Sequence, residues 1–137
     1  MNTRNFLFML ALSFVAGTVS AQAQNKALGS DRDKHGCIGS AGYTYSVIKK
    51  DCIRTFEQKV QLNEIHPKGS STSRAAVIFS DDNKMAEVFA PGIKSSVVLV
   101  RTGQQGKYKW KKGALQLEQN GQGYTLKKNN KAIFGQE

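Results

Sequence analysis

The sequence is poor in the residues from which most catalytic and metal sites are built. Its 137 residues include two histidines, two cysteines and ten acidic residues. His35 and His66 stand outside any nucleophile-type motif, so a Ser-His-Asp arrangement has little support. The cysteines and histidines show neither CxxC nor HxxxH spacing, and no glycine-rich phosphate loop ending in Lys-Ser or Lys-Thr occurs. We therefore expect no enzyme activity, no bound metal and no cofactor.

Long apolar runs are also scarce, and the most prominent one covers residues 6–16. This run follows Arg4, precedes the small-x-small sequence that ends at Ala23, and is shorter than the roughly 20 apolar residues that cross a bilayer. The pattern predicts a signal peptide over residues 1–23, which is cleaved during export to the periplasm or the extracellular space. An uncleaved anchor is the alternative, but the expected product is not transmembrane.

The residues after this predicted signal divide into a short polar segment and one domain. Residues 24–36 are polar and without periodicity, which is typical of a flexible leader. Residues 37–137 suffice for one hydrophobic core, and we expect a single β-rich domain.

Both cysteines lie in the sequence CIGSAGYTYSVIKKDCIR, residues 37–54. Two cysteines in an exported chain predict one disulfide, Cys37–Cys52. Closing a loop of about 15 residues stabilises a fold by about 3 kcal/mol in the chain-entropy model. Within the loop, Ser46 as an N-cap and apolar residues at helical spacing predict a short helix over about 46–54. The tyrosines and Val47 also alternate, so a strand is the alternative.

From residue 58 onward, apolar and polar residues alternate as in strands with one buried face. Turn signals divide this part into about eight strands, near residues 60–64, 75–79, 85–89, 96–101, 107–111, 115–117, 124–128 and 132–134. The fold class is therefore mainly β. A small antiparallel barrel or a strongly curled meander is the economical arrangement, because closure removes exposed sheet edges. A two-sheet sandwich is the alternative.

Positive charge is abundant where negative charge is scarce. The chain has twenty basic residues and a formal charge of +10. A basic exported protein is attracted to acidic glycans, lipid headgroups or acidic proteins, whereas export argues against nucleic acid.

A ladder of lysines is the best candidate binding feature. Alternation with Tyr108 and Trp110 predicts that the rings face the core and that the lysines share one outer wall. This set consists of Lys107, Lys109 and Lys111, with Lys112, Lys127 and Lys128 nearby. The alternative is a solvated face whose lysines keep a strand from pairing with other chains.

Residues 74–128 resemble the membrane-bound and periplasmic inhibitors of c-type lysozyme, which carry two motifs, SGxxY and YxxxTKG. Thr102 and Gly103 stand near the first motif, and YKWKKG, residues 108–113, stands near the second. The resemblance implies an exported eight-stranded barrel in which Thr102 and Lys112 enter the lysozyme cleft and engage its catalytic carboxylates. The cysteine-containing stretch is similar to a group of small bacterial envelope proteins of unknown function.

These observations predict an exported, non-catalytic binding protein of the bacterial envelope. Inhibition of a lysozyme is the specific hypothesis that the resemblance supplies. A basic module that binds anionic glycans or a membrane surface, and a structural envelope component, are the alternatives.

Overall fold

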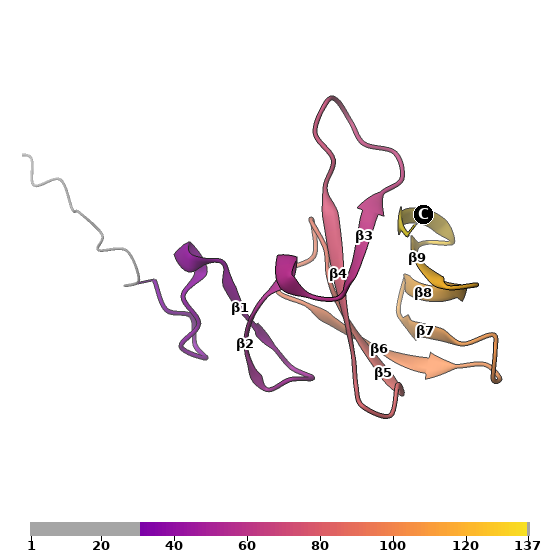
Figure 1. Cartoon of the computed structure of the whole chain (residues 1–137), viewed down its shortest axis with the longest axis horizontal. Helices are drawn as coiled ribbons and strands as arrows, with labels where there is room; N and C mark the ends of the chain where they lie inside the picture. The colour runs from indigo at the N-terminus through magenta and orange to yellow at the C-terminus, as the bar shows by residue number, and fades with distance from the viewer. Residues whose placement is uncertain (1–30, 137) are drawn as a thin grey trace, which may run out of the picture.

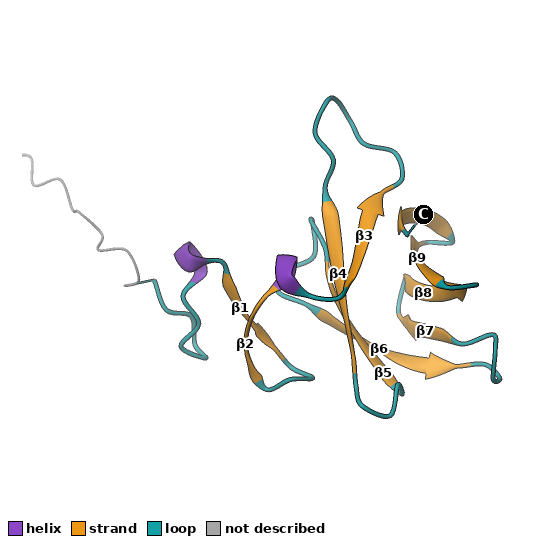
Figure 2. Cartoon of the chain, viewed as in Figure 1, coloured by secondary structure: helices purple, strands orange, loops and turns teal. Residues whose placement is uncertain are grey.

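A computed structural model describes residues 31–136, which form two antiparallel sheets (Figure 1). The predicted signal peptide and residues 24–30 of the predicted leader lie outside the described residues. The smaller sheet is a hairpin of β1 (Tyr43–Ser46) and β2 (Asp51–Arg54). Short 3₁₀ turns, η1 (Gly39–Ala41) and η2 (Thr55–Glu57), are the helical elements of the described part (Figure 2). In that part, no helix is long and apolar enough to cross a bilayer.

The larger sheet is a closed barrel of eight antiparallel strands, which confirms the predicted mainly β barrel. Each strand pairs with its neighbours in the chain, and the last strand closes the barrel against the first. The strands are β3 (Val60–Glu64), β4 (Arg74–Phe79), β5 (Met85–Phe89), β6 (Val97–Thr102), β7 (Lys109–Lys112), β8 (Leu115–Asn120), β9 (Gly123–Lys128) and β10 (Lys131–Gly135).

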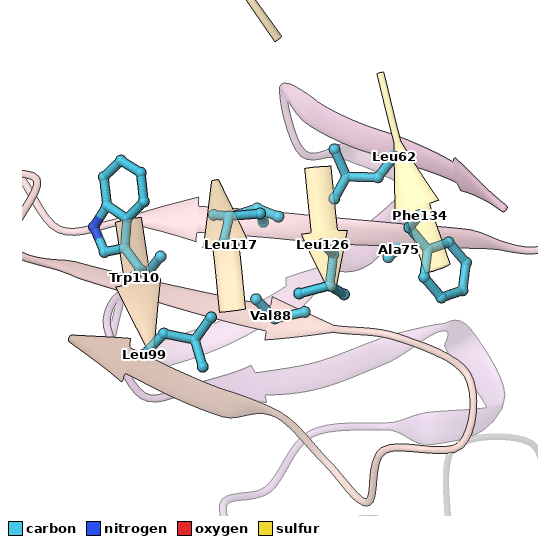
Figure 3. Close-up of a cluster of buried hydrophobic side chains, with 10 residues drawn as sticks. Leu62, Ala75, Val88, Leu99, Trp110, Leu117, Leu126 and Phe134 are labelled. Carbon is cyan, nitrogen blue, oxygen red and sulfur yellow. The ribbon is translucent and has the colours of Figure 1, made fainter. Parts of the chain in front are cut away.

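Every strand contributes at least one apolar side chain to the barrel interior, and β4 and β5 contribute two each (Figure 3). These residues are Leu62, Ala75, Val77, Ala86, Val88, Leu99, Trp110, Leu117, Leu126 and Phe134, and each is at most 6% exposed. Burying such a side chain stabilises the folded state by about 1.5–3 kcal/mol. Burial of the apolar residues that alternate along the strands is therefore the main force that closes the sheet. The single tryptophan donates its indole N–H to the carbonyl oxygen of Asn83 at 3.0 Å.

The helix predicted over residues 46–54 is wrong, and the strand alternative is confirmed. Ser46 forms the hydrogen bond expected of an N-cap, because its Oγ accepts the backbone N–H of Lys49 at 3.1 Å, but this bond closes the hairpin turn instead of starting a helix. The chain then turns back, with Lys50 at φ 54°, and Tyr45 pairs with Cys52 across the hairpin. Tertiary packing overrides the helical pattern, because the β2 residue Ile53 is buried only when β2 lies against the barrel.

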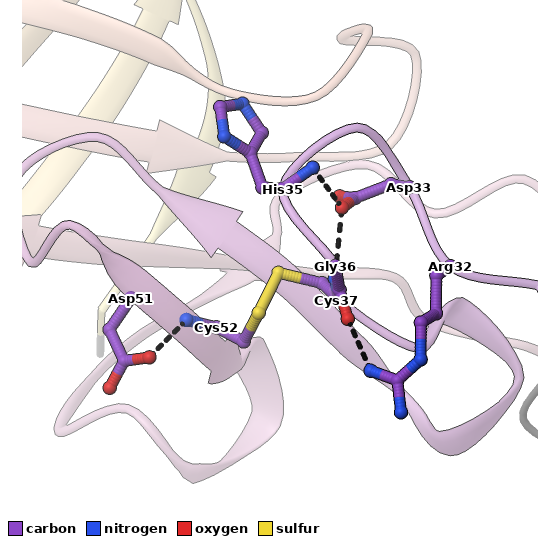
Figure 4. Close-up of a disulfide and its surroundings, with 7 residues drawn as sticks. All are labelled: Arg32, Asp33, His35, Gly36, Cys37, Asp51 and Cys52. Carbon is purple, nitrogen blue, oxygen red and sulfur yellow. Dashed lines mark hydrogen bonds between the residues drawn. A yellow bond between two sulfur atoms is a disulfide. The ribbon is translucent and has the colours of Figure 1, made fainter.

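We call residues 31–57 the clasp, because they form one unit that is stapled by the predicted disulfide Cys37–Cys52. The Asp33 carboxylate accepts the backbone N–H groups of His35 at 2.8 Å and of Cys37 at 2.9 Å (Figure 4). Arg32 donates to the carbonyl oxygen of Gly36 at 2.8 Å. Residues 31–36 therefore form a hydrogen-bonded turn, where the sequence pattern predicted a flexible leader.

The clasp lies on the outer face of β4 and β5. Ile53 packs there against Ala76, Ile78 and Phe89. Beside this apolar contact lies Glu87, which is 0% exposed.

Glu87 is the polar joint between the clasp and the barrel. Its carboxylate accepts the Ser46 hydroxyl at 2.6 Å and the backbone N–H groups of Val47 at 2.9 Å and Ile48 at 3.1 Å. The Ser96 hydroxyl, from the loop before β6, donates at 2.5 Å. Four donors thus replace the water that the carboxylate loses on burial.

Candidate functional site

The histidines and cysteines do not form a common site. His35 stacks on Tyr45 with a ring separation of 3.7 Å, whereas His66 lies in the β3–β4 loop. Among residues 31–136, no three histidine, cysteine, aspartate or glutamate side chains lie close enough together to hold a metal ion.

The structure places the six lysines of the predicted wall in three different settings. Lys109, Lys111 and Lys127 lie on the outer face, where they pair across strands with Glu118 and Gln116. Lys107 lies in the exposed loop before β7. Lys112 and Lys128 both pair with Leu115, which packs against the core, so they project with the core-facing residues at the end of the barrel. The prediction of one outer wall is corrected, because side chains alternate between faces along a strand.

The outer-wall lysines are partly neutralised by one acidic residue. Glu118 accepts Lys109 Nζ at 2.9 Å and Lys127 Nζ at 2.6 Å. Hydrogen bonds from Lys127 and Lys109 lower the pKa of Glu118 to about 2. This carboxylate therefore stays ionised near neutral pH and competes with any anion that approaches the wall.

Thr102 and Gly103 shape the β6–β7 turn. The Thr102 hydroxyl donates to the Lys109 carbonyl oxygen at 3.2 Å. A Cβ on Gly103, which has φ 92°, would lie 2.7 Å from the carbonyl oxygen of Lys107, so glycine is required there.

The two residues that the lysozyme-inhibitor resemblance singles out are not brought together. Thr102 pairs with Lys109 at one end of β7, while Lys112 occupies the other end. Lys109 and Lys112 are three positions apart along β7, which is about 10 Å. Because this spacing is odd, Lys112 projects from the opposite face of the sheet to Lys109 and its cross-strand neighbour Thr102.

The strongest segregation of charge lies between the two ends of the barrel. We call the end formed by the loops 65–73, 90–96, 113–114 and 129–130 the basic end, together with the adjoining strand residues. These four loops, all of which are described, contain no acidic residue, and Glu64 at the end of β3 is the acidic residue among the adjoining strand residues. The basic end carries five exposed lysines, which are Lys68, Lys94, Lys112, Lys128 and Lys131.

The opposite end, which we call the mixed end, has loops 80–84, 103–108 and 121–122. Here Asp81 and Asp82 balance Lys84 and Lys107, and Lys84 pairs with Asp82 at 3.3 Å. The four ion pairs of the described residues involve none of the five basic-end lysines. Their ammonium groups are therefore free of acidic partners and available to an external anion.

Sequence reasoning found Lys112 and Lys128 but missed Lys68, Lys94 and Lys131. These lysines are far apart in the chain and meet only because alternate turns of a meander share one end of a barrel. The sequence does place a lysine in or next to each of these alternate turns. Combined with the predicted barrel topology, this pattern would have indicated that the lysines lie at one end.

Two hollows adjoin the basic end. A cavity of about 360 Å³ is lined by Glu64, His66, Lys68, Ser73, Lys131 and apolar residues that include Pro91. A groove of about 600 Å³ runs between the clasp and the outer face of β4 and β5, and Pro91 lines it as well. The groove and the basic end therefore form one continuous surface.

Comparison of this chain with protein-family models, curated proteins and solved structures found no match.

Proposed function

We propose that this chain is an exported, non-catalytic protein of the bacterial envelope that binds acidic polysaccharide through its basic end. The observation that carries the proposal is the separation of charge between the two ends of one barrel. Five lysines outside any described ion pair and one acidic residue, Glu64, lie at the basic end, whereas acidic and basic residues are balanced in the loops of the mixed end. A barrel needs no such asymmetry of charge in order to fold, so we attribute the lysines to the binding of an anionic partner.

The disulfide supports the cellular compartment of this proposal. Cys37 and Cys52 are joined, and a bond of this kind persists in oxidising compartments outside the cytosol. Acidic polysaccharides are abundant polyanions in such places.

A glycan explains the basic end better than a membrane does. Proteins that dock on bilayers usually combine cationic residues with exposed apolar anchors. In the four loops of the basic end, Ile65 is the single large apolar residue that is markedly exposed, at 39%. Tyr43 and Phe56 line the adjoining groove, and Val47, Met85 and Val100 lie away from both the groove and the basic-end loops.

The test compares two triple variants of equal charge. Lys112→Gln/Lys128→Gln/Lys131→Gln removes three charges from the basic end, and Lys59→Gln/Lys84→Gln/Lys107→Gln removes three charges from outside it. Binding to alginate, a polymer of uronic acids, is measured across a salt series, with uncharged dextran as the control ligand. At about 1 kcal/mol per lysine, the basic-end variant loses on the order of a hundredfold in affinity. The control variant retains most of its affinity.

Equal losses in the two triple variants would refute a specific basic end. Tighter binding to vesicles that contain phosphatidylglycerol than to alginate would favour a membrane surface instead. Inhibition of c-type lysozyme is checked with the same proteins by measuring residual enzyme activity against increasing protein. Stoichiometric inhibition that weakens in Lys112→Ala would support the function that the resemblance implies.

A further inference from the structure

The groove between the clasp and the barrel exposes an aromatic ring that the fold holds in place. Phe56, on η2, lines the groove and is 66% exposed. A Cβ on Gly42, which has φ 80°, would lie 3.2 Å from Phe56 Cε1, so the glycine lets the ring rest against the start of β1. Tyr43, which is 36% exposed, lines the same groove, so the two rings form an exposed apolar patch of the kind that marks a binding surface.

A guanidinium group orders the aromatic side of the groove. The Arg54 guanidinium carbon lies 4.6 Å from the centre of the Tyr43 ring and 6.0 Å from that of Phe56. Arg54 also forms an ion pair with Glu57 at 3.1 Å. The two rings are thus preorganised, which lowers the entropy that a ligand must overcome.

Polar groups line the groove close to these rings. Gln61 donates to the carbonyl oxygens of Thr55 at 2.7 Å and Gln58 at 2.9 Å, which anchors η2 over the groove. The remaining polar lining includes Thr44, Ser95 and the exposed Arg74, which takes part in none of the ion pairs of the described residues.

We infer that this groove binds a sugar residue of the acidic polysaccharide that the basic end attracts. This inference rests on the proposed function and adds a site that distinguishes one sugar from another. Phe56 offers its face to the C–H groups of a sugar ring, since an aromatic face is electron-rich. The hydroxyl groups of Thr44 and Ser95 and the amide oxygen of Gln61 match sugar hydroxyls, and Arg74 matches a carboxylate or sulfate.

The composition of the groove argues against an apolar occupant. An acyl chain would cover the guanidinium of Arg74 and the hydroxyls of Thr44 and Ser95 without offering hydrogen bonds, which is costly. A sugar satisfies these groups and still covers the ring. The position of the groove agrees, because Ser95 directly follows the basic-end Lys94 and Pro91 lines both hollows.

The experiment uses short acidic sugars, so that the groove is tested apart from the multivalent attraction of a long polyanion. Hyaluronan hexasaccharide and hexagalacturonate are titrated into the protein and followed by calorimetry and by NMR chemical shifts. Phe56→Ala is the test variant, and Val100→Ala is its matched control, because Val100 is an apolar residue that is 57% exposed and lies outside the groove. Both variants are expected to retain the far-ultraviolet circular dichroism of the parent.

Phe56→Ala is expected to weaken hexasaccharide binding about tenfold, the usual size of a lost aromatic contact, and Val100→Ala to leave it unchanged. Arg74→Gln is expected to weaken the acidic sugars and to spare neutral chitohexaose. Absence of hexasaccharide binding at millimolar concentration, or equal binding by Phe56→Ala and the parent, would overturn the inference. Binding of long alginate chains would then still depend on the basic-end lysines if the proposed function is right, so the two failures are distinguishable.

Discussion

The barrel and the clasp solve the same problem of stability in different ways. The barrel encloses a wholly apolar core to which every strand contributes. The clasp buries little apolar surface of its own, with Cys37 and Ile53 as its buried apolar residues. It relies instead on one disulfide, one small contact with the outer face of the barrel, and three hydrogen bonds that it donates to Glu87. A closed sheet can thus carry a second structural unit on its outside without sharing its core.

The comparison predicts that damage inside the barrel has the largest effect. Leu99→Ala removes a side chain that is 0% exposed and leaves a cavity among strands that cannot collapse. We expect a loss of about 3–5 kcal/mol in the free energy of unfolding. Urea unfolding followed by the fluorescence of Trp110 measures it. Val100→Ala, one residue along and facing solvent, is the control, and an equal loss there would contradict this account of the core.

Breaking the staple should affect the clasp more than the barrel. Cys37→Ser/Cys52→Ser removes a cross-link over 15 residues, worth about 3 kcal/mol in the chain-entropy model. Amide hydrogen exchange is expected to speed up across β1 and β2 and to change little in the barrel. Trp110 fluorescence, which reports on the barrel interior, is expected to stay as in the parent. Simultaneous loss of both signals would show instead that clasp and barrel unfold as one unit.

The polar joint between the two regions should give the smallest of these effects. Glu87→Gln keeps the shape of the side chain but replaces one acceptor oxygen with an N–H₂ group that faces donors. We expect a loss of about 1–3 kcal/mol, the usual cost of leaving buried polar groups unpaired. Thermal unfolding of the parent and the variant measures it. Glu57→Gln, in an exposed ion pair, is the control, and a variant as stable as the parent would show that Glu87 does not hold the clasp.

The barrel could be predicted because its signals are local. Alternation placed the strands, and the Asn129-Asn130 turn, with φ values of 50° and 63°, is a two-residue turn of the kind that the sequence indicates. The clasp hairpin was missed because the helical spacing of its apolar residues is also a local signal. The packing of Ile53 against Phe89, which favours the hairpin, joins residues that are far apart in the sequence.

In the candidate site, too, local features could be predicted and features that depend on contacts distant in the sequence could not. Lys112 and Lys128 were visible as part of a run of lysines, but their separation from Lys109 and Lys111 depends on the register. The gathering of Lys68, Lys94 and Lys131 depends on closure of the barrel. Phe56 stood out in the sequence only as part of the apolar helical spacing, because its exposure and its contact with Gly42 arise only when η2 folds over β1.

The closing seam of the barrel has a consequence for the order in which the molecule folds and opens. Strands from β3 to β10 pair with their chain neighbours, so those pairings can form locally and early. The seam joins β3 to β10 through two register pairs, Glu64 with Phe134 and Asn63 with Gly135, whereas β8 and β9 share six. Closure is therefore the step with the highest loop entropy and the fewest backbone bonds. The seam should form last during folding and open first in the native protein, and the cavity lined by Lys68 and Lys131 lies beside it.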